Sequence, residues 1–177
     1  AIDLSGRTNL LDLGGGPGTW AIHFCLENPE LRATVFDLPS TRPFAENKIA
    51  AFGMRDRVTF EGGDFLVDPI VGRFDVAFLS HILHGEGAEE VERIIEKTLA
   101  QVDDGGMILI QEFFLDDDRT GPLRPALFSL NMLVGTPEGR AYSWSEVEGM
   151  LRDCGAHELE RLDLESPPGS GFLRAIR

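Results

Sequence analysis

A run of glycines near the start of the chain has the spacing of a nucleotide-binding turn. The segment 10–19 reads Leu-Leu-Asp-Leu-Gly-Gly-Gly-Pro-Gly-Thr, and it joins a short apolar run to a stretch with helical spacing. Gly14, Gly16 and Gly18 would let the backbone approach a ligand closely while N–H groups of the following helix face it. A plain tight turn, the alternative, would not need three glycines in this context. The segment therefore predicts a nucleotide-like ligand.

An acidic residue stands at a fixed distance beyond the glycines. Asp37 ends a second apolar run, 32–36, and is followed by Leu38, Pro39 and Ser40. In nucleotide-binding α/β folds a carboxylate about 20 residues after the glycines accepts hydrogen bonds from the ribose hydroxyls of the adenosine. Capping of the helix that follows is the alternative role. Asp37 is accordingly a candidate ribose ligand for either NAD or S-adenosylmethionine.

His81 and His84 are close enough in sequence to do acid–base or metal chemistry together. An unperturbed imidazole titrates at about pH 6.5, so much of it is free base at neutral pH and can take a proton from a hydroxyl. The two rings could also ligate a metal ion, but the sequence suggests no third ligand. We therefore predict no metal site. Packing or helix capping by either ring is the alternative to a chemical role.

The framework for these residues is an alternation of strands and helices. Apolar runs predict five strands, at residues 9–13, 32–36, 57–61, 74–79 and 107–115. Helical spacing predicts three helices between them, at residues 19–26, 40–52 and 89–101. Ser40 would cap the second helix, and residues 103–106 would end the third. Five such β-α units predict a doubly wound parallel sheet.

The pattern changes in the last third of the chain. Helices are predicted at 125–134 and 145–154, and two further strands at 157–164 and 171–176. A Ser-Pro-Pro-Gly-Ser turn joins these strands, which must then be antiparallel. We predict one α/β domain spanning residues 1–177, with a Rossmann-like, doubly wound, mostly parallel seven-stranded sheet that ends in an antiparallel hairpin.

Three features favour S-adenosylmethionine over NAD as the ligand. The glycines follow G-x-G-x-G, whereas the dinucleotide motif is G-x-G-x-x-G. Asp12 precedes the glycines, and the predicted sheet ends in a hairpin. An NAD-dependent oxidoreductase is therefore the second choice among enzymes.

Five segments of the chain resemble one known family. They match, in order and spacing, the C-terminal catalytic domain of class I S-adenosylmethionine-dependent O-methyltransferases of the plant caffeic-acid and bacterial hydroxyneurosporene type: 11–18, 36–39, 62–65, 82–84 and 110–112. The resemblance implies methyl transfer to a hydroxyl of an aromatic or polyketide-like small molecule in secondary metabolism. Family members also carry an N-terminal helical domain that supplies dimer contacts. We expect this chain to lack that domain and the full-length protein to be a homodimer.

The same resemblance implies a set of cofactor-binding residues. In it Asp37 binds the ribose, Asp64 contacts the adenine side with Phe65 stacking nearby, and Ser80 touches the methionine end. The complete set is Gly14, Gly16, Asp37, Leu38, Asp64, Phe65 and Ser80.

The resemblance also implies two catalytic residues. His84 occupies the position of the general base, and Glu112 that of an acid that would hold the ring in one tautomer. A solvated acid at a strand end is the alternative for Glu112. The chain departs from the family at Gly85-Glu86, where Asp-Trp is usual, and at Ala141, where plant members have a second glutamate. A catalytically inactive cofactor-binding domain is therefore the non-enzymatic alternative.

Related enzymes form their acceptor pocket in a stretch that here contains Phe128, Asn131, Met132 and Tyr142. We expect the first three to bind the acceptor. Phe128 and Met132 are four residues apart on a predicted helix, so core or dimer contacts are an alternative for both.

Composition excludes several other classes of protein. Against 16 Lys and Arg the chain has 30 Asp and Glu, a formal charge of −14, whereas nucleic-acid backbones are bound by clustered cations. The sequence contains no apolar run of the roughly 20 residues that a membrane helix needs, and no secretion signal. Cys25 and Cys154 are far apart and form no metal-binding pair. We expect a cytoplasmic protein with a small-molecule acceptor and neither nucleic acid nor membrane as partner.

Overall fold

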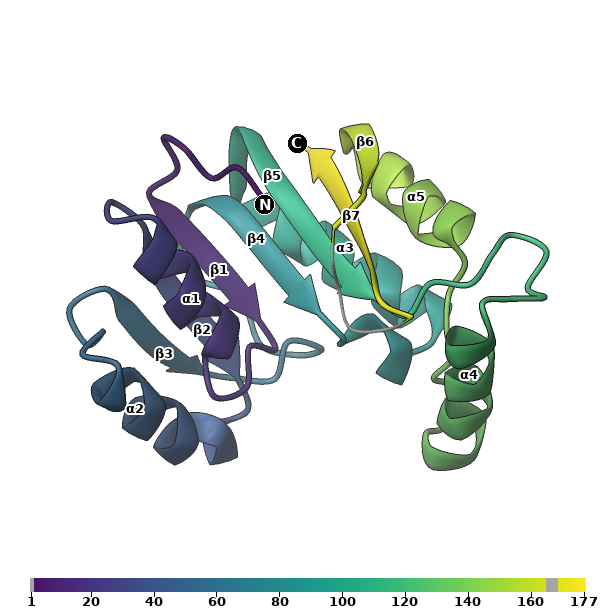
Figure 1. Cartoon of the computed structure of the whole chain (residues 1–177), viewed down its shortest axis with the longest axis horizontal. Coiled ribbons are helices and arrows are strands. Elements are labelled where there is room, and N and C mark those ends of the chain that lie inside the picture. The colour runs from purple at the N-terminus through teal and green to yellow at the C-terminus, as the bar shows by residue number, and fades with distance from the viewer. Residues whose placement is uncertain (1, 165–168) are drawn as a thin grey trace.

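A computed structural model describes residues 2–164 and 169–177 of the chain. Seven strands form one sheet in the order β3-β2-β1-β4-β5-β7-β6 (Figure 1). All pairs from β3 to β5 are parallel, and β7 lies antiparallel between β5 and β6. The strands are β1 (Asn9–Leu13), β2 (Arg32–Asp37), β3 (Val58–Gly62), β4 (Phe74–Ser80), β5 (Val102–Glu112), β6 (His157–Leu162) and β7 (Gly171–Ile176). The predicted fold is confirmed.

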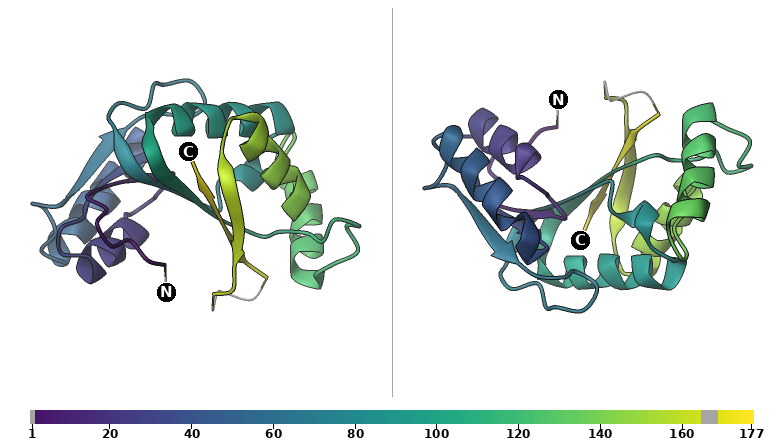
Figure 2. Two further views of the ribbon diagram at one scale, coloured as in Figure 1. Left: turned by 90° about the horizontal axis from the view of Figure 1, so that it is seen from above. Right: turned by 90° about the horizontal axis from the view of Figure 1, so that it is seen from below.

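Helices cover the two faces of this sheet. Figure 2 shows α1 and α2 on one side of the sheet and α3 on the other. α5 packs on β6 and α3, while α4 projects beyond the end of the sheet (Figure 1). The helices are α1 (Thr19–Glu27), α2 (Arg42–Ala51), α3 (Ala88–Gln101), α4 (Leu123–Gly135) and α5 (Trp144–Asp153). No helix among the described residues is long and apolar enough to cross a bilayer.

The sheet separates two apolar clusters. Successive side chains of a strand point to opposite faces, so in β1 Leu10 joins the cluster beneath α1 and α2, and Leu11 joins the cluster beneath α3 and α5. Both leucines are completely buried. Burial of one such side chain stabilises the fold by roughly 2 kcal/mol. The core thus lies on both faces and holds the strand ends in fixed positions.

The third helix ends at Gln101, before residues 103–106, in line with the prediction, but the fifth strand begins at Val102 and not at 107. The four residues Asp-Asp-Gly-Gly lie within an irregularity of the β4–β5 pairing, where Gly105 has a φ of +75°. They add no apolar side chain to the core, so the hydrophobic pattern gave no strand signal. At its other end β5 stops at Glu112, three residues before its predicted end, and Leu115 forms an isolated parallel bridge with Ser143 instead.

Capping of the second helix by Ser40 is also wrong. A short turn, η1 (Pro39–Thr41), precedes α2, and Ser40 lies inside it. Proline suits the first position of a helical turn, so the turn begins at Pro39. Thr41 stands at the cap position of α2, but its hydroxyl donates a hydrogen bond to Asp37.

The connection between β3 and β4 differs from the predicted β-α unit. Residues 63–73 contain no helix, so the expectation of five such units is wrong here. Lys97 of α3 holds this loop, because its Nζ donates 2.7 Å hydrogen bonds to the carbonyls of Phe65 and Asp68. In the hairpin, β7 has its predicted bounds, while residues 166–168 of the predicted turn lie outside the described residues.

Candidate functional site

The carboxyl ends of β1, β2, β4 and β5 bring most of the predicted site residues together. β1 and β4 are neighbours, but the next strands in the chain lie on opposite sides, β2 beside β1 and β5 beside β4. Ligands of open α/β sheets bind in the crevice at such a switch point, outside the carboxyl ends of the strands. The glycine turn follows β1, and His81 and His84 follow β4.

Gly14 lies where three of these segments meet. Its φ of +66° belongs to the left-handed region, and its N–H donates a 2.8 Å hydrogen bond to the carbonyl of Phe36 in β2. A Cβ at this position would come within 2.5 Å of the Ile82 side chain and 3.6 Å of the Phe65 ring. Glycine is therefore required both for the backbone conformation and for the close packing of the turn.

Asp37 links the end of β2 to the glycine turn. Its Oδ2 accepts a 2.7 Å hydrogen bond from the N–H of Gly16. Its Oδ1 accepts from the N–H of Leu38 at 2.7 Å and from the hydroxyl of Thr41 at 3.0 Å. Asp37 thus contacts the turn that leads into α2 without capping a helix, and it also lies against the predicted ligand-binding loop.

Asp12 is a buried carboxylate beneath the glycine turn. From the sequence it was noted only as the acidic residue that precedes the glycines. Oδ2 accepts a 3.1 Å hydrogen bond from the N–H of Ala21, and Oδ1 has no partner among the described residues. A Cβ on Gly15 would lie 2.5 Å from the carboxylate. Burial raises the pKa of Asp12 to about 7, although the bond from Ala21 opposes this, and the nearby charge of Asp37 raises it further.

Asp64 and Phe65 begin the loop that follows β3. The Oδ1 of Asp64 accepts a 2.9 Å hydrogen bond from the N–H of Leu66, and the N–H of Asp64 donates to Asp68. Both predicted residues are half-buried. Since the Phe65 ring also lies near Gly14, the structure brings this predicted adenine-side pair to the glycine turn.

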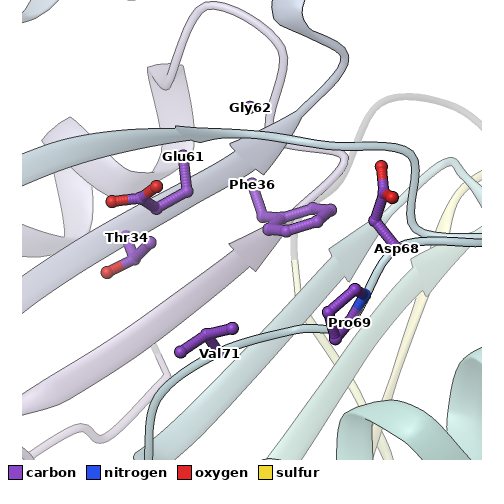
Figure 3. Close-up of a pocket in the computed structure, with 7 residues that line it drawn as sticks. All are labelled: Thr34, Phe36, Glu61, Gly62, Asp68, Pro69 and Val71. Carbon is purple, nitrogen blue, oxygen red and sulfur yellow. The ribbon is translucent and has the colours of Figure 1, made fainter.

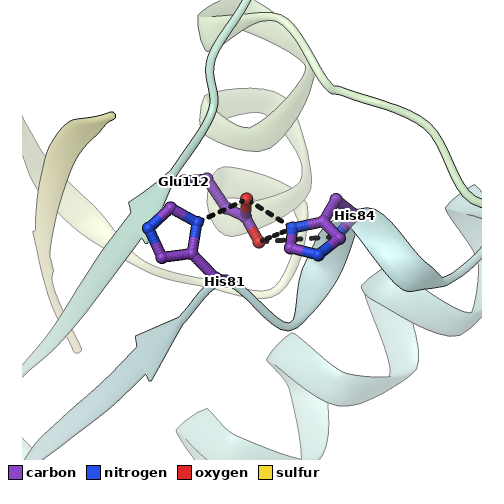
Figure 4. Close-up of side chains that lie close together, drawn as sticks. All are labelled: His81, His84 and Glu112. Carbon is purple, nitrogen blue, oxygen red and sulfur yellow. Dashed lines mark hydrogen bonds and ion pairs between the residues drawn. The ribbon is translucent and has the colours of Figure 1, made fainter. Parts of the chain in front are cut away.

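Glu112 and His84 form a close pair (Figure 4). The Nδ1 of His84, in the short turn η2 (Leu83–Gly85), lies 2.9 and 3.1 Å from the two oxygens of Glu112. Glu112 is 4% exposed and also accepts hydrogen bonds from the backbone N–H groups of Leu83 and Phe113. The alternative of a solvated strand-end acid is therefore wrong.

His81 contributes a third group to this cluster. Its Nδ1 lies 3.6 Å from Oε2 of Glu112, within ion-pair range but longer than a hydrogen bond. Burial raises the pKa of Glu112, but contact with His81 and His84 outweighs burial and holds that pKa at about 2.

The cluster also supplies the third potential metal ligand that the sequence did not suggest. One donor atom each from His81, His84 and Glu112 lies within 4.8 Å of the others. The oxygens of Glu112, however, already accept N–H donors from the backbone and from His84. This arrangement fits a hydrogen-bonded carboxylate–imidazole pair.

Ser80 lies at the end of β4, beside this cluster. Its hydroxyl donates a 3.0 Å hydrogen bond to Oε1 of Gln111 in β5. Ser80 therefore fixes the neighbouring strand ends, which position His81 on one side and Glu112 on the other.

The predicted acceptor residues divide into two groups. The Phe128 ring meets the His84 ring edge-on with centroids 4.7 Å apart, and Phe128 and Asn131 line a hollow of about 290 Å³. Met132 is half-buried on the same helix. Tyr142, which lies in the same stretch of sequence but was not expected to bind the acceptor, belongs to the core, where its hydroxyl donates to the carbonyl of Glu86.

A second hollow lies away from these residues, over β2 and β3 (Figure 3). Its volume is about 560 Å³, and it is lined by Thr34, Phe36, Glu61, Gly62, Asp68, Pro69 and Val71. The sequence predicted none of these as site residues. This hollow is therefore distinct from the cluster at the strand ends.

Comparison with known proteins identifies the family. The sequence profile of the O-methyltransferase domain matches residues 1–157. The chain belongs to this O-methyltransferase family. The chain is 38% identical over 177 residues to 3-hydroxy-5-methyl-1-naphthoate 3-O-methyltransferase of Streptomyces sahachiroi, covering all of this chain and 51% of that protein. It thus spans about half the length of the curated relatives it matches.

Solved O-methyltransferase structures share the fold. A family 2 protein of Planctomyces limnophilus in complex with apigenin superposes with a TM-score of 0.88 at 31% identity, over all of this chain and 52% of that one. Human N-acetylserotonin methyltransferase in complex with S-adenosylmethionine superposes with a TM-score of 0.87 at 31% identity, over 99% and 49% of the two chains. These matches do not support the NAD-dependent oxidoreductase alternative.

Proposed function

We propose that this domain binds S-adenosylmethionine and catalyses transfer of its methyl group to a hydroxyl of an aromatic or polyketide-like small molecule. The observation that carries the proposal is the His84–Glu112 pair at the carboxyl ends of β4 and β5, where Ile82, two residues before His84, packs closely against Gly14 of the glycine turn. The naphthoate specificity in the name of the Streptomyces relative and the apigenin bound to the Planctomyces protein support an aromatic acceptor.

The loop geometry fits this methyl donor. Gly14 and Gly16 keep the turn open, and Asp37, with Leu38 next to it, is positioned to accept the ribose hydroxyl hydrogens. Asp64 and Phe65 would flank the adenine, and Ser80 would lie toward the methionine end. When bound, S-adenosylmethionine supplies an electrophilic methyl group on a sulfonium. The human relative with this cofactor bound supports the assignment.

His84 is suited to act as the general base. When Nδ1 of a neutral His84 carries the proton and donates a hydrogen bond to Glu112, the other ring nitrogen, Nε2, is unprotonated. Nε2 can then take the proton of an acceptor hydroxyl. The carboxylate would then pair with the imidazolium that forms. Removal of the hydroxyl proton makes the acceptor oxygen a stronger nucleophile, and fixing it in line with the methyl group supplies a further large part of the rate.

Phe128 and Asn131, with Met132 beside them, would line the acceptor site. The Phe128 ring forms a wall against His84. An aromatic acceptor could pack there with its hydroxyl directed at the imidazole. On the family resemblance we also propose that the whole protein is a homodimer and works in the cytoplasm.

The test is product detection by mass spectrometry after incubation with labelled S-adenosylmethionine and either a hydroxynaphthoate or apigenin. We expect an added methyl group on one acceptor, and a loss of roughly 100-fold or more in rate for His84→Ala. An unchanged rate in His84→Ala would refute the base. Cofactor binding without a methylated product from any acceptor would favour the inactive binding domain.

A further inference from the structure

His81 has a left-handed backbone conformation, which residues other than glycine adopt uncommonly. Its φ is +57°, in the left-handed region, and its N–H donates a 2.9 Å hydrogen bond to the carbonyl of Gln111. Residues other than glycine in this region are uncommon, and such strain is found preferentially at functional sites. A reason for His81 at this position should therefore lie in its side chain.

The ring of His81 is held on three sides. It packs against the Phe113 ring with centroids 4.6 Å apart, and its Nε2 lies 3.1 Å from the hydroxyl of Ser170, just before β7. Its Nδ1 faces Oε2 of Glu112 at 3.6 Å. Figure 4 shows the carboxylate of Glu112 between the two imidazoles, which come from opposite sides.

The Ser170 contact bears on which nitrogen carries the proton. When the Ser170 hydroxyl donates to Nε2, the proton of a neutral His81 ring must be on Nδ1, facing Glu112. His84 also presents its Nδ1 to this carboxylate. Two imidazoles therefore compete for the negative charge of a single carboxylate.

We propose that His81 is a positioning residue that shares Glu112 with His84 and thereby limits how tightly His84 holds a proton. This inference rests on the proposed function of His84 as a general base. Such a base must also release the proton that it has taken, so its proton affinity matters for turnover. A neutral His81 with its proton on Nδ1, or a protonated His81, partly neutralises the negative charge of Glu112. Removal of the ring should therefore strengthen proton binding by His84.

Other ionisable groups belong to the elements around the pair. They include Arg140, whose N–H donates to the carbonyl of His84, Arg124, which lines the hollow beside Phe113 and Phe128, and Glu86, two residues after His84. All of them stay in place when His81 is replaced. A change in the titration of His84 can then be assigned to the loss of His81.

The test uses nitrogen-15 NMR of the histidine rings, which reports the tautomer and the midpoint of each titration without any turnover. The chain has only four histidines, so each ring can be assigned by single substitutions. His81→Gly removes the ring but tolerates the positive φ, and His81→Asn tolerates that φ while placing an amide donor near the position of Nδ1.

We expect His81→Gly to raise the midpoint of the His84 titration by roughly 0.5–1 pH unit, and His81→Asn to reverse most of that rise. An unchanged or lowered midpoint in His81→Gly would overturn the proposal. Identical His84 midpoints in His81→Gly and His81→Asn would also overturn it. In a purely structural role, the amide donor of asparagine would have no effect on the titration of His84.

Ser170→Ala provides a test that leaves His81 in place. We expect the proton of the neutral His81 ring to stay on Nδ1 without the Ser170 hydroxyl, because the Glu112 carboxylate faces that nitrogen, and the His84 midpoint to change little. A move of the proton to Nε2 would contradict the proposal, because Nδ1 would then offer Glu112 only a lone pair. Calorimetric titration of the same samples with S-adenosylhomocysteine separates the two ideas, since failure to bind it would refute the proposed function and leave the NMR result standing.

Discussion

The carboxylate of Asp37 accepts a 2.7 Å hydrogen bond from the backbone N–H of Gly16, across the ends of β2 and β1. Two features that are separate in the sequence, the glycine turn and the acid that follows it, are therefore one structural unit. A change in the carboxylate should alter the cofactor site at two places, the predicted ribose contact and the loop itself.

Asp37→Asn should weaken binding of S-adenosylhomocysteine by roughly 10- to 100-fold. The amide keeps one acceptor oxygen but loses the charge and the second acceptor, which together are worth about 1.4–2.8 kcal/mol in such hydrogen bonds. Isothermal titration calorimetry measures the effect. Asp104→Asn is the matched control, because the Asp104 side chain is fully exposed and belongs to a different part of the sheet. Equal affinities of the two variants would rule out the ribose contact.

Asp12 should make the domain less stable as the pH rises. Its pKa in the folded state, about 7, lies above the ordinary 3.8, so its contribution is complete below pH 3.8 and is lost as the pH rises through 7. We expect the free energy of unfolding to fall by roughly 2–3 kcal/mol between pH 5 and pH 8 from this group. Urea unfolding at both pH values should show a smaller fall in Asp12→Asn. The same fall in both proteins would show that Asp12 is not the cause.

Glu112 should act in the opposite direction and at lower pH. Its pKa of about 2 lies below the ordinary 4.5, so its stabilising contribution is present above pH 4.5 and is lost as the pH falls toward 2. Thermal unfolding between pH 5 and pH 2.5 should reveal a decline that is weaker in Glu112→Gln. At pH 7 that variant should be less stable by roughly 2–4 kcal/mol, because its amide cannot satisfy all the buried donors. A variant as stable as the parent at pH 7 would contradict the pairing.

Gly14→Ala should disturb the cofactor loop by more than its backbone strain. The left-handed conformation costs an alanine roughly 1–2 kcal/mol, and the added Cβ would also lie 2.5 Å from Ile82. Gly6→Ala isolates the first effect, since Gly6 has a φ of +76° but no atom within 4 Å of the added carbon. Chemical unfolding and cofactor titration should both show the larger loss in Gly14→Ala. Equal losses would mean that the close approach to Ile82 has no cost.

Local patterns were sufficient for the fold and for the glycine turn. Apolar runs predicted the five parallel strands, a short turn motif predicted the final hairpin, and the spacing of Gly14, Gly16 and Asp37 was meaningful because these residues follow neighbouring parallel strands. The bounds failed where polar residues continue a strand, as at 103–106, and where Pro39 begins a turn before the predicted cap. In both places a neighbouring element fixes the backbone, which a local pattern does not reveal.

The cluster of His81, His84 and Glu112 was only partly predictable. His84 and Glu112 came from the family resemblance, but the contact of His81 with Glu112 depends on the pairing of β4 with β5 and on the positive φ of His81. Histidine adopts a positive φ more often than most residues, but too rarely for its type alone to predict that conformation. Tyr142 was noted only as part of the stretch that forms the acceptor pocket in related enzymes, and here its hydroxyl donates to the Glu86 carbonyl inside the core.

The central claim is that the glycine turn and the carboxylate ending β2 hold the adenosine of S-adenosylmethionine. Isothermal titration calorimetry of the folded domain with S-adenosylmethionine, and with NAD as the comparison, tests it most directly. We predict one site per chain for S-adenosylmethionine and no measurable heat of binding for NAD. Binding of NAD in preference to S-adenosylmethionine, or of neither ligand to well-folded material, would contradict the assignment.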